Sequence, residues 1–131
     1  MSCRNLLLLF ILLAACNTSG NKRHERLISY EARFFGEPGL MDEKIYRAIS
    51  GEKFYSKTDT IKYLKGRIYI SYLGLLNGCG EHKGAIRFKG DSLFVDAVNV
   101  SDEACASETC DRLIFVIENK QNKRFKIVKG R

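Results

Sequence analysis

The stretch RIYISYL, residues 67–73, alternates between two kinds of position. One set of positions is apolar or aromatic and consists of Ile68, Ile70 and Tyr72. Successive side chains of a β-strand point to opposite faces, so a period of two predicts a half-buried strand. The same period recurs over residues 28–34, 86–89 and 124–127, and it predicts antiparallel sheet along much of the chain.

Turn signals divide these alternating stretches. Gly66, Gly90 and the pair Asn77-Gly78 stand between them, and residues 119–122 (NKQN) predict a last hairpin. About eight strands are expected, from nine candidate stretches near residues 27–35, 44–49, 52–56, 59–64, 67–73, 84–89, 92–99, 112–118 and 123–128. The regular spacing predicts an all-β fold, a small antiparallel β-sandwich or barrel with at most one short helix.

Three segments leave a choice or make a sharper statement. Residues 41–49 fit either a strand or a short helix, and residues 101–108 fit a single helical turn. Residues 113–117 are apolar throughout, which predicts a strand covered on both faces.

Length and composition bound the class of protein. The chain has 131 residues, of which 45% are hydrophobic, so one domain is expected, over residues 27–131. This composition excludes a disordered chain, a collagen-like repeat and a multi-pass membrane protein.

The N-terminus has the layout of a secretory signal peptide. Arg4 precedes an apolar run over residues 6–15, and small residues lead to Cys16. The run has ten residues, whereas a helix that spans a bilayer needs about 20. The polar and basic residues 17–26 cannot bury enough surface to order themselves, so they predict a flexible tether.

Leu13-Ala14-Ala15-Cys16 resembles the lipobox of bacterial lipoproteins. The resemblance implies a signal peptide over residues 1–15, a lipidated Cys16, and a lipid-anchored tether that ends at residue 26. Palmitate-like acyl chains on Cys16 would make the membrane the first partner, because two or more lipid chains anchor a protein stably. With Asn17 after the cysteine, the sorting rule of enteric lipoproteins implies the outer membrane. In some bacterial groups an acidic cluster after the cysteine exports lipoproteins to the cell surface; residues 17–24 contain no acid, so the periplasmic face is expected. The chain as a whole resembles the small β-rich lipoproteins of Gram-negative bacteria.

Charge is unevenly distributed. The chain carries a net charge of +7, with six basic residues and no acid over residues 119–131. Residues 96–111 carry five acids and no base. The basic end could meet an anionic surface, such as lipid head groups or lipopolysaccharide phosphates, or an acidic envelope protein. Alternatively, it is a solvated hairpin whose charges prevent edge-to-edge aggregation. Nucleic acid is not an expected partner of an exported protein.

The cysteines allow two interpretations. In an oxidising compartment, Cys79, Cys105 and Cys110 predict one disulfide, with the pairing open and one thiol left over. Together with His82 the same three cysteines form the ligand set of a zinc site, and thiolates also suit copper(I). The sequence thus leaves a disulfide and a Cys3His metal site as alternatives.

No catalytic motif stands out, and no cofactor other than that metal is expected. The two histidines are His24, in the tether, and His82, and no nucleophile elbow, zinc-protease motif or phosphate loop occurs. A non-catalytic envelope binding or structural module is therefore the first hypothesis.

The alternative is a periplasmic inhibitor of a lysozyme-like hydrolase. Membrane-bound lysozyme inhibitors are also small β-barrel lipoproteins with a disulfide, and their inhibitory loop is rich in Ser, Gly, Tyr and Lys. Residues 71–74 (SYLG) share part of that composition. The oligomeric state is left open.

Overall fold

A computed structural model of the protein describes residues 22–51 and 53–130. The predicted signal peptide, Cys16 and the first part of the tether lie outside the described residues. Seven strands and one short α-helix make up most of the described chain. In order they are β1 (Leu27–Gly36), a 3-10 turn (Pro38–Leu40), α1 (Glu43–Ser50), β2 (Thr60–Leu64), β3 (Arg67–Asn77), β4 (His82–Lys89), β5 (Ser92–Asn99), β6 (Glu108–Glu118) and β7 (Lys126–Lys129).

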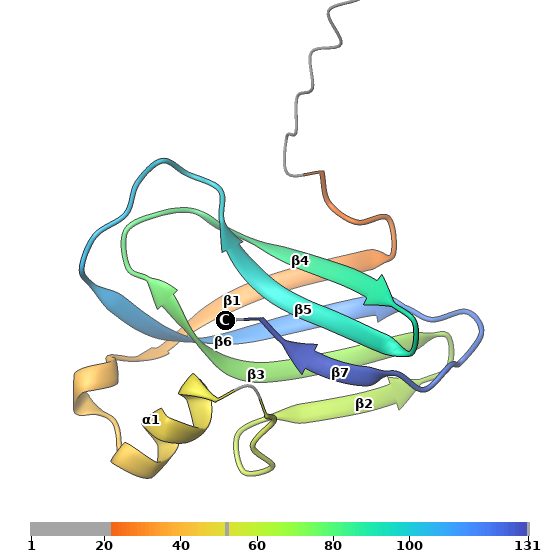
Figure 1. The fold of residues 1–131 in the computed structure, drawn as a ribbon, viewed down its shortest axis with the longest axis horizontal. Helices are drawn as coiled ribbons and strands as arrows, with labels where there is room; N and C mark the ends of the chain where they lie inside the picture. The colour runs from red at the N-terminus through yellow and green to blue at the C-terminus, as the bar shows by residue number, and fades with distance from the viewer. Residues whose placement is uncertain (1–21, 52, 131) are drawn as a thin grey trace, which may run out of the picture.

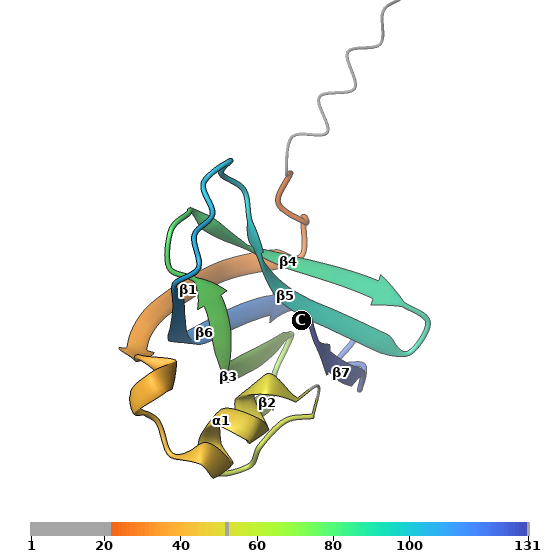
Figure 2. The same ribbon diagram turned by 60° about the vertical axis from the view of Figure 1, so that its left-hand side comes forward.

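The strands form two sheets packed face to face, as the views in Figures 1 and 2 show. The four-stranded sheet has the order β1-β6-β3-β2, and the three-stranded sheet has the order β4-β5-β7. In the described part of the chain the strands form two separate sheets rather than one closed barrel. The all-β prediction is confirmed, and the structure decides for the sandwich.

Two hairpins follow the sequence prediction closely. The β2–β3 turn pairs Leu64 with Arg67, and the β4–β5 turn pairs Lys89 with Ser92. Gly66 has φ 72° and Gly90 has φ 57°, in the left-handed region that glycine enters without steric cost. These two-residue loops fix the register, so Ile68 and Ile70 of β3 and Leu93 of β5 point into the core.

The main core lies between the sheets. Its fully buried members include Ile68 and Ile70, from the predicted alternation of residues 67–73, Phe115 and Ile117 of β6, and Leu93 from the other sheet. β3 and β6 pair along their whole lengths, from Arg67 opposite Glu118 to Asn77 opposite Glu108. Truncating Phe115 to Ala would cost about 3–5 kcal/mol, because the cavity left between two sheets cannot collapse fully.

The chain is helical over Glu43–Ser50, so of the two alternatives for residues 41–49 the short helix is correct and the strand at 44–49 is wrong. Asp42 caps the helix by accepting the Lys44 N–H at 2.9 Å. Ile45 and Ile49, one turn apart, pack on Leu73 and leave the opposite face of α1 to solvent. Figure 2 shows α1 beneath β3, on the outer side of the four-stranded sheet.

The other segments also differ from expectation. Residues 53–56 form no strand, because Asp59 folds them into a turn by accepting the Tyr55 N–H at 2.8 Å. Residues 101–107 form no helical turn. Within residues 113–117 only alternate side chains are fully buried, because α1 covers just one end of the outer face.

The position of the C-terminal strand, β7, differs most from the predicted topology. Residues 119–122 do not close a hairpin, because β7 leaves the four-stranded sheet and pairs parallel with β5. Alternation alone does not distinguish a parallel neighbour from an antiparallel one. Tyr63 of β2 marks the crossing, since its hydroxyl donates to the Phe125 carbonyl at 2.8 Å.

A buried ion pair fastens β7 to the other sheet. Lys129 Nζ lies 3.3 Å from Asp59 Oδ2, and the two side chains are only 3% and 2% exposed. Asp59 also accepts the Thr58 hydroxyl at 2.9 Å, and the rings of Phe54 and Tyr72 lie near the ammonium group. The carboxylate is therefore supplied with several hydrogen bonds in place of water.

Removing one partner of this pair should destabilise the fold strongly. For Asp59→Ala we expect a loss of about 3–5 kcal/mol in the free energy of unfolding, because the Lys129 charge is left buried and unpaired. The double variant Asp59→Ala with Lys129→Met should recover part of that loss. Urea unfolding measures both, with Glu43→Gln, in an exposed ion pair, as the control. A loss below about 1 kcal/mol for Asp59→Ala would contradict the assigned role.

Candidate functional site

Two of the candidate cysteines are joined. Cys79 and Cys105 form a disulfide with their Cα atoms 5.6 Å apart. It connects the β3–β4 loop to the β5–β6 loop, which lie side by side at one end of the sandwich (Figure 1). Asn77 reinforces the junction: its Nδ2 donates to the Cys105 carbonyl at 2.6 Å, and its Oδ1 accepts the Cys79 N–H at 3.0 Å. On the loop-entropy account this cross-link contributes about 3–4 kcal/mol.

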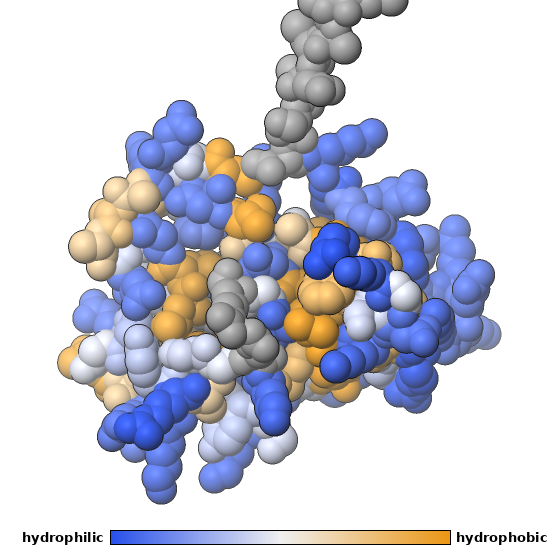
Figure 3. Space-filling view, viewed as in Figure 1, coloured by the Kyte–Doolittle hydropathy of each residue, from blue (hydrophilic) through white to orange (hydrophobic). Residues whose placement is uncertain are grey.

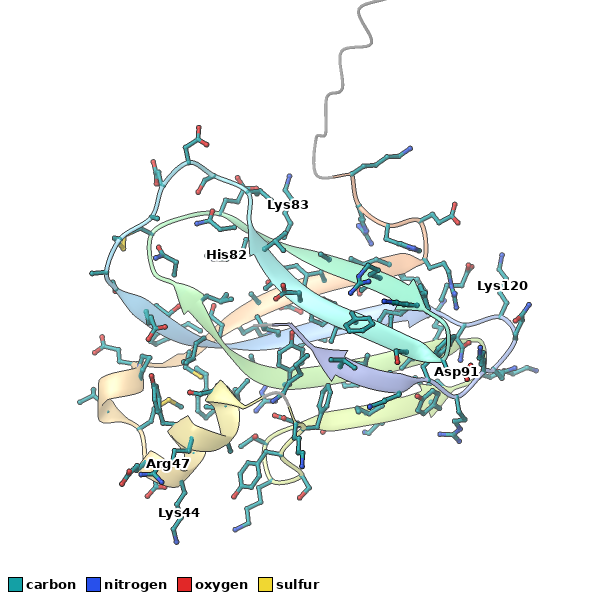
Figure 4. All side chains as sticks on the ribbon, viewed as in Figure 1. Lys44, Arg47, His82, Lys83, Asp91 and Lys120 are labelled. Carbon is teal, nitrogen blue, oxygen red and sulfur yellow. A yellow bond between two sulfur atoms is a disulfide. The ribbon has the colours of Figure 1, made fainter. Side chains whose placement is uncertain are left out.

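The structure does not bring the four predicted metal ligands together. Cys110 lies in β6, buried with Ile49 and Leu73 beneath α1 on the outer face of the four-stranded sheet. His82, labelled in Figure 4, stands at the start of β4 and lines the space between the sheets. Within residues 22–51 and 53–130, no group of three or more His, Cys, Asp or Glu side chains is arranged to hold a metal ion.

The surroundings of the free Cys110 thiol disfavour its thiolate form. Burial raises the pKa of Cys110 to about 11, with a further contribution from the neighbouring Asp111 carboxylate. Because the thiolate is the nucleophile and the metal-binding form, this environment suppresses both roles at neutral pH. Cys110 acts as a small apolar side chain in the described structure.

A cleft opens between the two sheets next to the disulfide. It has a volume of about 390 Å³ and is bordered by α1, by the second half of β3 and by the ends of β5 and β7. Its apolar lining includes Leu75 and Leu113, and its polar lining includes His82, Asp96 and Glu108. In the space-filling view, hydrophobic side chains reach the surface over this part of β3 (Figure 3).

Burial in and near the cleft raises the pKa values of one carboxyl group and two tyrosine hydroxyl groups. Loss of hydration raises the pKa of the Asp96 carboxyl, although the Ala97 N–H donates to it at 2.8 Å. Burial likewise raises the pKa of Tyr72, and the nearby Asp96 carboxylate adds to this effect. Tyr30, deeper between the sheets, has its pKa raised to about 12 by burial and by Asp111 and Asp96.

Among the described side chains, two buried polar atoms have no hydrogen-bond partner, and neither residue lines the cleft itself. They are the Tyr30 hydroxyl and Asp111 Oδ1. Buried polar groups are nearly always paired, and clefts with perturbed pKa values and convergent polar groups are the usual place for a binding site. The cleft is therefore the candidate functional site.

The chain matches no family model, no curated protein and no solved structure in the comparisons made. The site is therefore interpreted from its own geometry.

Four basic side chains of the C-terminal region contact other residues of the fold. Lys129 is buried against Asp59, Lys123 lies 2.8 Å from Asp91, and Arg124 stacks over the Tyr63 ring. Lys120, labelled at the end of the molecule in Figure 4, lies 3.3 Å from Glu118. The part of this region described by the structure thus offers fewer free charges than its sequence suggests.

The segment considered for hydrolase inhibition is not a loop. Ser71, Tyr72 and Leu73 are buried in the middle of β3. Residues 71–74 therefore cannot project from the domain as an inhibitory loop would.

The sequence interpretation missed most of the cleft. It considered His82 as a metal ligand. It did not connect Asp96, Glu108 and Lys129, which come from different strands. One available signal was Asp96 itself, an acid within an otherwise apolar strand, LFVDAV. In residues 22–51 and 53–130, no helix has the length and apolar character needed to cross a membrane.

The thiol arrangement predicts an alkylation pattern for the mature protein. Unfolding without reductant should expose the Cys110 thiol alone, and unfolding with reductant should expose Cys79 and Cys105 as well. Intact mass after alkylation counts the modified thiols. Three reactive thiols without reductant, together with a retained zinc or copper ion, would contradict the disulfide and restore the metal site.

Asp96 predicts an unusual dependence of stability on pH. Its pKa is raised in the folded state, so the folded protein binds the proton more tightly than the unfolded chain does. The free energy of unfolding therefore falls as pH rises from the unfolded pKa of Asp96 through its folded pKa. Asp96→Asn should therefore unfold at higher urea than wild type at pH 7, with the gain lost below about pH 4.

Asp91 is the control, because its pKa is shifted in the opposite direction to that of Asp96. The hydrogen bond from Lys123 lowers the pKa of Asp91, so Asp91→Asn should give no gain at pH 7. A loss of stability in Asp96→Asn at pH 7 would show that the carboxylate supports the fold and is not a burden on it.

Proposed function

We propose that the protein is a lipid-anchored bacterial envelope protein, a lipoprotein whose β-sandwich serves as a non-catalytic binding module. The Leu13-Ala14-Ala15-Cys16 motif supports export and lipidation. The observation that carries the proposal is the Cys79–Cys105 disulfide. Structural disulfides persist in oxidising compartments such as the periplasm and are rare in the bacterial cytosol, so the fold and the leader agree on an exported protein.

The cleft supports binding as the activity of the domain. It combines an apolar floor with the charged and polar groups Asp96, Glu108 and His82, the usual composition of a ligand site. The Tyr72 hydroxyl in the cleft donates to the Val95 carbonyl at 3.4 Å, so it is held by the backbone. A module that holds a partner near the membrane fits this chemistry best.

The anchor predicts a defined mature species. The chain should begin at Cys16, carry a mass increment for a diacylglyceryl group and an N-terminal acyl chain, and partition into detergent. Cys16→Ser should abolish the increment and leave the leader uncleaved, whereas Cys3→Ser should change neither. Intact mass of the purified protein measures both. A mature chain without lipid at Cys16 would overturn the proposal.

Location is tested separately. We expect the lipidated protein in the outer-membrane fraction and protected from protease in intact cells, in keeping with a periplasmic face. Degradation of the domain in intact cells would place it on the outer surface instead.

A further inference from the structure

The edge of β3 is uncovered along its second half. β2 pairs with β3 only from Arg67 to Ser71, where Thr60 is the last partner. Figure 1 shows β2 beside only one half of β3. On that side, residues 72–77 have no strand neighbour in the described part of the chain.

The uncovered edge presents backbone hydrogen-bonding groups. The Leu73 N–H donates to Asp59 Oδ1 at 3.4 Å, so it points away from β6. In an antiparallel strand, alternate residues direct their N–H and C=O groups to the same side. The N–H and C=O groups of Leu75 and Asn77 therefore point toward the uncovered side, and no described backbone group bonds to them there.

The cleft runs along this edge. Its lining includes β3 residues from both faces, with Tyr72 and Leu76 from the inner face and Leu73 and Leu75 from the outer face. A space that touches both faces of a strand lies over its edge. At about 3.4 Å per residue, residues 72–77 offer an edge of about 17 Å, enough for a strand of four or five residues.

The charged groups that line the cleft give the chemistry of its occupant. Asp96 and Glu108 are its acids, and the charge of its one lysine, Lys129, is balanced by Asp59. The partly exposed apolar lining includes Leu75 and Ala97. A complementary segment is extended and carries Lys or Arg toward the acids and apolar side chains toward this lining.

We propose that the cleft captures an extended basic peptide segment of a partner protein, which adds as a strand beside residues 72–77 of β3. In this mode of recognition, main-chain hydrogen bonds supply affinity and pockets for alternate side chains supply specificity. The inference rests on the proposed function only in naming that partner an envelope protein.

A second copy of this chain is a poorer occupant. Exposed strand edges tend to pair with one another, and proteins protect them by covering or shortening them. Here the edge is recessed between α1 and the ends of β5 and β7, so the same edge of another copy would be recessed in its own cleft. A single free segment can enter where a folded sheet cannot.

The test uses the purified mature protein and a library of randomised nine-residue peptides displayed on phage. Selected peptides are synthesised, and their affinities are measured by fluorescence anisotropy. We expect Lys or Arg at alternate positions of the enriched sequences. Each backbone nitrogen of the best peptide is then methylated in turn, which removes one N–H without altering the protein.

Strand addition predicts a period of two in this methylation series. Methylation at positions that pair with Leu75 and Asn77 should weaken binding about tenfold or more, and methylation at the intervening positions should have little effect. Asp96→Asn and Glu108→Gln should each weaken binding of the basic peptide, with Asp91→Asn, outside the cleft, as the matched control.

The alternative outcomes are separable. A methylation series without a period of two, or binding indifferent to Asp96 and Glu108, would overturn strand addition, as would a library that yields no enriched peptide. Self-association of the protein that peptide cannot compete would assign the edge to a second copy and overturn the proposal. The mass at Cys16, measured on the same sample, reports on the anchor independently of all these results.

Discussion

The fold depends on one buried contact, the ion pair between Lys129 and Asp59. β7 is only four residues long, and it pairs with a sheet that its preceding strand, β6, does not belong to. The crossing is stable because Lys129 finds its only described anionic partner on the opposite layer, in the loop before β2. Asp59 in turn shapes that loop through the Tyr55 N–H and the Thr58 hydroxyl. Removing either partner would leave the other charge buried and unpaired, so the pair ties the position of β7 to the loop before β2.

The cleft is a consequence of the same arrangement. Asp59 turns the chain at the point where β2 begins, so β2 covers only the first half of β3. The second half of β3 then faces the end of β7, and Asp96 and Tyr72 are held there at a cost in hydration. The disulfide and Asn77 hold the adjoining loops together at this end. Proteins commonly retain destabilising groups where they bind, because the site cannot be optimised for both purposes.

Much of the fold could be predicted from local pattern. The alternation over residues 67–73 and the glycines at 66 and 90 predicted β3 and two hairpins, which the structure confirms. The helix at Glu43–Ser50 was ambiguous, because Ile45 and Ile49 fit either period until Leu73 gives them a surface. The parallel placement of β7 was missed, because four residues carry too little pattern to name a neighbour. The candidate site was missed for a related reason, since its charged groups come from separate strands.

The sequence by itself determined the all-β class, the two tight turns and the buried face of β3, and it left a disulfide and a metal site as alternatives for the late cysteines. These features depend on neighbours within a few residues, or on composition, and local physics suffices for them. Only the tertiary structure decided which cysteines join, that Cys110 is buried beneath α1, and that Lys129 is used inside the fold. It alone leaves the edge of residues 72–77 open, because that depends on where β2 stops and β7 crosses, and long-range packing sets both.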